Sequence, residues 1–221
     1  MRLRPLLPLA VLGSAVWYVR RVHRFRDPVR LPPAHTDAVL SPADGVVCFV
    51  RRVSNGQIET AGSARPVHAF AGDVATDGWL LGVVIGPLDV HYTYLPVGGT
   101  VGTIAHTPAS AAAPLLPLQV QAGLLARQPT DLLDAPGMWH NERLAVTVHA
   151  DMGDMTVTMV APGPPLDAMP YVKQGDRARA GYKLAFLPRG GLVTIALPAH
   201  MTPLVSVGDH VTGMQTVFAR A

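Results

Sequence analysis

The chain has 221 residues, with 49% hydrophobic and 15% charged side chains, and is long enough for one substantial domain or two small ones. The charged share lies well below the usual value of about 25%, so the chain is apolar for a soluble protein yet too polar for one that crosses a membrane many times. Seven of the 18 Lys and Arg residues and one of the 15 Asp and Glu residues precede Leu31, which leaves 11 basic and 14 acidic residues for the rest, a balance that argues against a nucleic-acid-binding face on the body.

The first expected element is an N-terminal membrane anchor. Residues 5–19 carry no charge, and four arginines follow within residues 20–26. The uncharged run is shorter than the about 20 residues of a full span, so a partly inserted hairpin is an alternative form of the anchor, while the arginines disfavour a cleaved signal peptide and a buried core helix. Because the heavier basic flank is C-terminal, we expect residues 1–30 to anchor the protein in the cell membrane and residues 31–221 to form a body on the cytoplasmic side.

From Leu31 onward the sequence predicts a mainly β body. Short apolar runs recur between turn residues, as expected of strands, whereas the Ala and Pro clusters of residues 107–136 predict a loop or a short helix. Two Gly-Asp turns, within residues 174–181 and 207–213, form a weak internal repeat. Such turns are common in lipoyl-like domains, so we expect a lipoyl-like β-sandwich (barrel-sandwich hybrid) with an N-terminal membrane helix. The runs expected to be strands are GVVCFV, WLLGVVI, LAVTVHA, MTVTMV and LVTIAL.

Six short segments carry a resemblance to a known family. They are FRDPVR (25–30), SPADGVV (41–47), PLDVHYTYLPVGG (87–99), NER (141–143), residues 172–181 and residues 192–198. Each is weak alone, but together and in this order they resemble the short form of the phosphatidylserine decarboxylase family. The resemblance implies an enzyme of phospholipid biosynthesis that converts phosphatidylserine to phosphatidylethanolamine and CO₂, with a pyruvoyl cofactor made from one of its own serines.

The same resemblance implies two catalytic residues. Asp44 matches the acid of the S-P-A-D-G segment, and His91 matches the histidine of P-L-D-V-H. Both would move protons during self-cleavage and decarboxylation. Judged without the resemblance, Asp44 is equally suited to cap a turn, and His91 to be a hydrogen-bonded histidine of the core.

The serine that the family converts into its pyruvoyl group is missing. Counted back from residues 197–198, the family's Gly-Ser pair falls on Gly190-Gly191, and glycine has no hydroxyl with which to attack the preceding carbonyl. Only Ser14 and Ser63 follow a glycine elsewhere in the chain. We therefore expect a divergent member that does not mature itself and holds no pyruvoyl group, which makes it a candidate pseudoenzyme.

Three functions stay open on the sequence alone. The first is a decarboxylase relative that has lost self-maturation and keeps a headgroup pocket, the second an active decarboxylase with another source of its carbonyl, and the third a membrane-tethered adaptor without catalysis. The expected partners are a phospholipid headgroup or a membrane surface and, in a homo-oligomer, a second copy; no nucleic acid, metal or bound cofactor is expected. His149, Asp151 and Asp154 have the residue types of a metal site, but their spacing is more typical of a hairpin turn.

Overall fold

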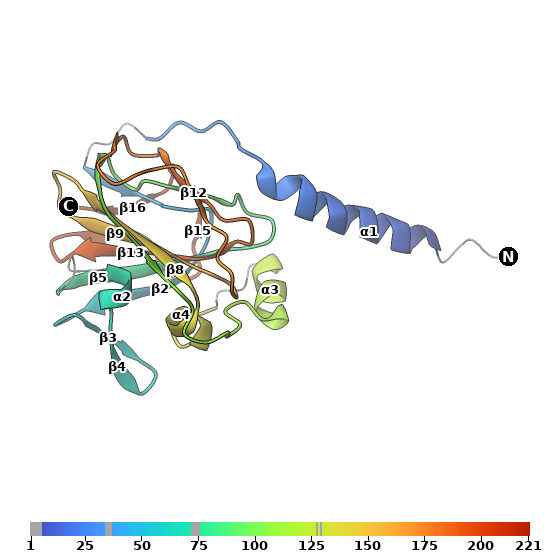
Figure 1. Ribbon diagram of the computed structural model, residues 1–221, viewed down its shortest axis with the longest axis horizontal. Helices are drawn as coiled ribbons and strands as arrows, with labels where there is room; N and C mark the ends of the chain where they lie inside the picture. The colour runs from blue at the N-terminus through green and yellow to red at the C-terminus, as the bar shows by residue number, and fades with distance from the viewer. Residues whose placement is uncertain (1–5, 34–36, 72–75, 127, 129) are drawn as a thin grey trace.

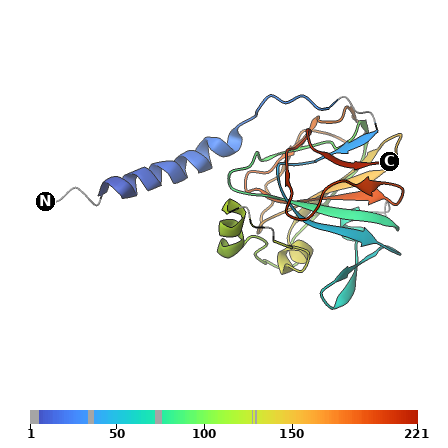
Figure 2. The same cartoon turned by 180° about the vertical axis from the view of Figure 1, so that it is seen from behind.

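The structure is a computed structural model that describes residues 6–33, 37–71, 76–126, 128 and 130–221. It begins with a helix, α1 (Leu6–Arg21), and a 3-10 turn, η1 (His23–Phe25), and α1 projects away from a β body in Figures 1 and 2. Helix α1 has 16 residues, about 24 Å at 1.5 Å per residue, against about 30 Å of hydrocarbon core. Among the described residues no helix is long and apolar enough to cross a membrane. The prediction of a single N-terminal membrane anchor with the body on the cytoplasmic side is therefore wrong.

The body is built around one eight-stranded antiparallel sheet (Figure 1). Its strands follow the order β11-β7-β8-β9-β13-β5-β2-β15. Their bounds are β2 (Gly45–Val53), β5 (Gly78–Ile85), β7 (Gly99–Thr107), β8 (Arg143–His149), β9 (Met155–Val160), β11 (Arg177–Ala178), β13 (Gly191–Pro198) and β15 (His210–Val211). The five apolar runs of the sequence form most of β2, β5, β8, β9 and β13, with only the last residue of LAVTVHA outside its strand, so the prediction of a mainly β body is confirmed.

Smaller sheets and short helices complete the body. One three-stranded sheet contains β1 (Ala38–Leu40), β16 (Val217–Arg220) and β14 (Thr202–Pro203), and another contains β10 (Met169–Pro170), β12 (Lys183–Phe186) and β6 (Tyr92–Tyr94). A separate hairpin pairs β3 (Gln57–Thr60) with β4 (Ser63–Pro66). The helices are α2 (His68–Ala71), α3 (Leu118–Leu125) and α4 (Pro136–His140). Because α3 lies within residues 107–136, the expected loop or short helix in that region is confirmed.

The central strand β13 is buried on both faces, which explains why its sequence does not alternate with polar residues and why its one polar side chain, Thr194, is itself buried. Val193 and Ile195 pack into the larger of two apolar clusters, while Leu192 packs into the other. Strands β5 and β9 pair with β13 on its two sides, and Gly191 stands opposite Ile85. The candidate site lies at this end of the sheet.

Two parts of the body repeat the same backbone contacts. The Gly-Asp turns at residues 175–176 and 208–209 have glycines with φ of 89° and 95°. In the first turn, the Gly175 amide donates to the Val101 carbonyl of β7 at 2.8 Å, and the Val101 amide donates to the Asp176 carbonyl at 2.8 Å. In the second turn, the Gly208 amide donates to the Val47 carbonyl of β2 at 2.8 Å, and the Val47 amide donates to the Asp209 carbonyl at 2.9 Å. The internal repeat of the sequence is therefore also a repeat of structure. The first unit consists of residues 41–47 and 207–213, and the second of residues 95–101 and 174–181.

Candidate functional site

The loop after β5 holds His91 at the end of the sheet. Asp89 Oδ2 accepts a hydrogen bond from the Gly86 amide at 2.7 Å, which closes the turn before the histidine. His91 is 5% exposed, and its Nδ1 lies 2.9 Å from the Leu187 carbonyl oxygen. Since a carbonyl can only accept, Nδ1 carries the proton of the neutral ring and Nε2 carries the lone pair. Burial lowers the pKa of His91, the nearby charge of Arg24 adds to this effect, and the ring is neutral at pH 7.

We expect His91 to make the protein sensitive to mild acid. The unfolded chain protonates this histidine near its ordinary pKa of about 6.5, whereas in the folded chain the pKa is lower. The free energy of unfolding therefore falls as the pH drops below the ordinary value, because the unfolded state binds the proton more readily. Urea unfolding at about pH 7.5 and about pH 5.5 should show this loss in the wild-type protein and a smaller loss in His91→Gln. Equal losses in the two proteins would contradict the prediction.

The Gly190-Gly191 pair lies beside His91. The Gly190 amide donates to the same Leu187 carbonyl at 2.9 Å, and a Cβ atom on Gly190 would lie 3.7 Å from Cε1 of His91. Gly191 opens β13 with a φ of 135°, a conformation that favours glycine. A Cβ atom there would lie 2.4 Å from the Val160 carbonyl oxygen, well inside van der Waals contact. The backbone at residue 191 is therefore shaped for glycine.

Asp44 lies at the same end of the sheet but faces a different set of groups. Asp44 precedes β2, which pairs with one side of β5. Gly191 lies in β13, which pairs with the other side of β5, so β5 separates Asp44 from Gly191. Both oxygens of the Asp44 carboxylate accept from Arg30, at 2.5 and 2.6 Å. The structure thus brings His91 to the Gly190-Gly191 pair and holds Asp44 in a buried ion pair. The acid and base roles that the resemblance assigns to Asp44 and His91 stay predictions.

Residues 23–30, which we call the strap, bind to the body through their charged side chains. The sequence pattern indicates the basic flank of an anchor here, but Arg24, Arg26 and Arg30 all contact groups of the body. Arginine has several donors in a fixed plane, which suits it to carbonyl and carboxylate oxygens. Besides the Arg30–Asp44 pair, the contacts include Arg24 Nη1 to the Pro188 carbonyl (3.1 Å), Arg26 Nη2 to the Leu88 carbonyl (2.6 Å), Arg30 Nη1 to the Gly213 carbonyl (3.2 Å) and the ion pair of Asp27 with Lys183.

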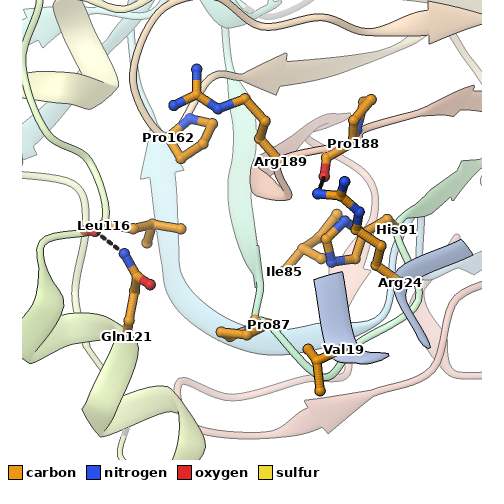
Figure 3. Close-up of a pocket in the computed structure, with 11 residues that line it drawn as sticks. Val19, Arg24, Ile85, Pro87, His91, Leu116, Gln121, Pro162, Pro188 and Arg189 are labelled. Atoms are coloured by element: carbon orange, nitrogen blue, oxygen red, sulfur yellow. Dashed lines mark hydrogen bonds between the residues drawn. The ribbon is translucent and has the colours of Figure 1, made fainter. Parts of the chain in front are cut away.

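A cavity of about 400 Å³ lies between the strap, His91 and the turn at residues 188–190 (Figure 3). Its polar lining residues are Arg24, His91, Gln121 and Arg189. None of the described lining residues is acidic, so the pocket is cationic while His91 is neutral. Of these four polar lining residues, the sequence motifs identified only His91. Arg24, Gln121 and Arg189 lie outside the motifs of the family. The apolar lining residues are Val19, Ile85, Gly86, Pro87, Leu116, Pro162 and Pro188.

The N-E-R motif has a structural role away from this pocket. Asn141 is fully buried and donates from Nδ2 to the Ala161 carbonyl at 2.9 Å. Glu142 accepts from the Leu166 amide at 2.9 Å and pairs with His106 at 2.7 Å. The hydrogen bond from His106 is the main reason why the pKa of Glu142 is lowered. The motif therefore ties the loop after β9 to the start of β8.

The cluster at residues 149–154 is a hairpin turn, as the sequence predicts. It joins β8 to β9, in which Val148 pairs with Met155. His149 Nδ1 lies 2.8 Å from Asp154 Oδ2 across the turn. Within the part of the chain that the structure describes, no group of three or more His, Cys, Asp or Glu residues could hold a metal ion.

An antiparallel β body, with the histidine of the P-L-D-V-H segment buried beside the turn at residues 190–191, is compatible with the resemblance to phospholipid decarboxylases. The sequence model of the phosphatidylserine decarboxylase family matches residues 17–219, and the chain belongs to this family. It is 26% identical to the phosphatidylserine decarboxylase proenzyme of Chlorobium limicola over 219 residues, 98% of this chain and 86% of the relative. The identity is 29% over 222 residues with the proenzyme of Gluconacetobacter diazotrophicus, 99% of this chain and 85% of the relative. The resemblance that the motifs indicate is confirmed.

Proposed function

We propose that the protein remains a single uncut chain and binds a phospholipid headgroup in the pocket around His91 without decarboxylating it. The names of its relatives, phosphatidylserine decarboxylase proenzymes, support a phospholipid as the ligand. The cationic lining of the pocket supports a ligand that carries a phosphate. The observation that carries the proposal is the glycine at position 191.

Residue 191 does not fit the pyruvoyl group of the family. That group forms from a serine whose hydroxyl attacks the preceding carbonyl, and it then supplies the electron sink for decarboxylation. Gly191 has no hydroxyl, its φ is 135°, and a Cβ atom would lie 2.4 Å from the Val160 carbonyl oxygen. Both the chemistry and the backbone at this position therefore oppose formation of the group, and we assign no carbonyl chemistry to the site.

The nearest hydroxyl on β13 is poorly placed to replace the missing serine. Thr194 is fully buried and stands three residues along the strand. It is opposite Gly82 on one side and Thr158 on the other, so strand pairing fixes its backbone from both sides. Of the serines that follow a glycine, Ser63 lies in the separate β3–β4 hairpin. These positions support an uncut chain.

Intact mass spectrometry and a carbonyl assay test the proposal together. We expect one species near 23.4 kDa that does not react with hydrazine-type reagents and releases no CO₂ from phosphatidylserine, while soluble headgroup compounds bind. A small C-terminal fragment with a carbonyl-reactive N-terminus, together with CO₂ release, would show an active decarboxylase with another carbonyl source. An uncut chain that binds no headgroup compound would refute the binding half of the proposal.

A further inference from the structure

The strap lies on the body without joining any of its sheets. Its described backbone hydrogen bonds stay within the N-terminal segment, from the Phe25 amide to Val22 and from the Arg26 amide to His23, and none reaches the body. After Phe25 the strap has no regular secondary structure, and it runs along the outside of the body in Figures 1 and 2. A segment without strand pairing can leave the surface without breaking a sheet, as expected of a part of a protein that opens locally.

Side chains alone fasten the strap to the body, and they do so along its whole length. The buried contact is the one between Arg30 and Asp44, whose side chains are 9% and 11% exposed, whereas Asp27 and Lys183 are 46% and 36% exposed. Because water screens an exposed ion pair, the Arg30–Asp44 pair is the principal fastener. The remaining contacts are those of Arg24 and Arg26 with body carbonyls and the stacking of Phe25 on Phe186, with ring centroids 5.2 Å apart.

The other end of the strap covers the cavity around His91. Arg24 lines this cavity together with Val19 of α1, whereas the remaining lining residues belong to the body. Figure 3 shows Arg24 beside His91. Nε2 of His91 and Nε of Arg24 are both buried without a hydrogen-bond partner among the described residues. Lifting the strap therefore uncovers the cavity and the lone pair of the imidazole.

The middle of the strap is stiff enough to connect its two ends. Pro28 fixes its own φ, and its ring restricts the backbone of Asp27. The 3-10 turn η1 constrains residues 23–25 in the same way, through the hydrogen bonds from Phe25 and Arg26. Only six residues of chain lead from Arg24 to Arg30, so a displacement of one arginine is transmitted to the other.

We propose that the strap is a lid that opens and closes as one unit, held shut by the Arg30–Asp44 ion pair. Opening exposes His91 near one end of the strap and separates Arg30 from Asp44 at the other. The open state leaves a carboxylate without its counter-charge, which favours reclosure. Access to the cavity is thus controlled by Asp44, a residue that does not line it. The lid goes beyond the proposed function, since it acts on any molecule that enters the cavity.

Limited digestion of the full chain with trypsin at about pH 7.5, with mass spectrometry of the fragments, measures the opening, because cutting follows the open population when opening is fast relative to cleavage. Trypsin cuts after Arg24 and Arg30 in the strap, and after Arg179, an exposed reference site on the body. In Asp44→Asn, cutting after Arg24 and after Arg30 should rise by the same factor, at least about tenfold, the effect of weakening a charge-assisted contact. Cutting after Arg179 should not change.

Two further variants grade this result. Lys183→Met removes the exposed ion pair in the middle of the strap, so cutting after Arg24 and Arg30 should rise only about twofold, again equally at the two sites. Asp131→Asn is the matched control, because it disrupts the exposed pair of Asp131 with Arg51 outside the strap. Its cutting rates should equal those of the wild type.

A chemical probe reports on the cavity itself. Diethyl pyrocarbonate modifies an unprotonated imidazole nitrogen, and Nε2 of His91 is buried while the strap is closed. His91 should therefore react more slowly than His200, which is exposed. In Asp44→Asn the reaction at His91 should accelerate by the same factor as cutting after Arg24, while the reaction at His200 stays constant.

Three outcomes would overturn the lid. A rise in cutting after Arg30 alone would show that the contacts open independently, and an equal rise after Arg179 would show that the whole protein unfolds. Unchanged cutting and unchanged His91 modification in Asp44→Asn would show that the ion pair does not control the strap. No ligand enters these experiments, so their failure leaves the proposed function standing, and a failure of headgroup binding leaves the lid standing.

Discussion

Replacing Arg30 by methionine is expected to lower the free energy of unfolding by about 3–5 kcal/mol. Arg30 donates to both oxygens of the Asp44 carboxylate, at 2.5 and 2.6 Å, and the two side chains are only 9% and 11% exposed. Methionine fills a similar volume but leaves a buried carboxylate without its counter-charge, although the Gly213 amide still donates to it at 2.8 Å. Urea unfolding at neutral pH measures the loss.

An exposed pair of the same residue types is the matched control. Arg51 and Asp131 lie 2.6 Å apart with side chains 37% and 40% exposed, so Arg51→Met should cost less than about 1 kcal/mol. The double variant Arg30→Met/Asp44→Asn should be less destabilised than the sum of its single variants, because it leaves no charge buried alone. If Arg30→Met costs no more than Arg51→Met, the ion pair does not hold the strap to the body.

Restoring a serine at position 191 is expected to destabilise the protein by about 3 kcal/mol and to leave the chain uncut. A residue with a Cβ atom is strained at a φ of 135°, and its Cβ would approach the Val160 carbonyl oxygen to 2.4 Å. The turn would have to shift before a hydroxyl could be aimed at the Gly190 carbonyl. Urea unfolding and intact mass spectrometry of Gly191→Ser measure the two effects.

Gly163→Ser is the control for this variant. Gly163 has no atom within 4 Å of the position of an added Cβ, so the same substitution should change the free energy of unfolding by less than about 0.5 kcal/mol. Cleavage of Gly191→Ser next to the new serine, at unchanged stability, would mean that the backbone at residue 191 adapts readily and that His91 already has processing geometry.

Burial explains which strands could be predicted from the sequence. The runs in β5, β9 and β13 are rich in apolar residues and carry no polar side chains other than buried threonines, because both faces of each strand are covered. Their order could not be predicted, since nothing in LVTIAL indicates that WLLGVVI and MTVTMV are its two neighbours. Only the family motifs connect His91 with Gly190, because the two positions are 99 residues apart in sequence.

The N-terminal region shows where a local pattern is ambiguous. An apolar run followed by arginines is typical of a membrane anchor, but the same arginines can bind carbonyl oxygens of the protein itself. Arg24 bonds to the Pro188 carbonyl, 164 residues away, and Arg26 to the Leu88 carbonyl, 62 residues away. Such partners are set by tertiary structure, and no pattern within residues 1–30 distinguishes them from water or lipid.

The two repeated units of the body also allow the needs of the scaffold to be separated from those of the site. Asp44 occupies the fourth position of the segment 41–47, and its counterpart in the segment 95–101 is Gly98. A Cβ on Gly98 would meet its nearest atom at 3.5 Å, an ordinary contact, so the second unit has room for a side chain at this position and folds without a carboxylate there. The Asp44–Arg30 ion pair is thus present in only one of the two repeated units, although their backbone contacts are alike. The unit with Gly98 therefore serves as an internal reference for what Asp44 adds to the other unit.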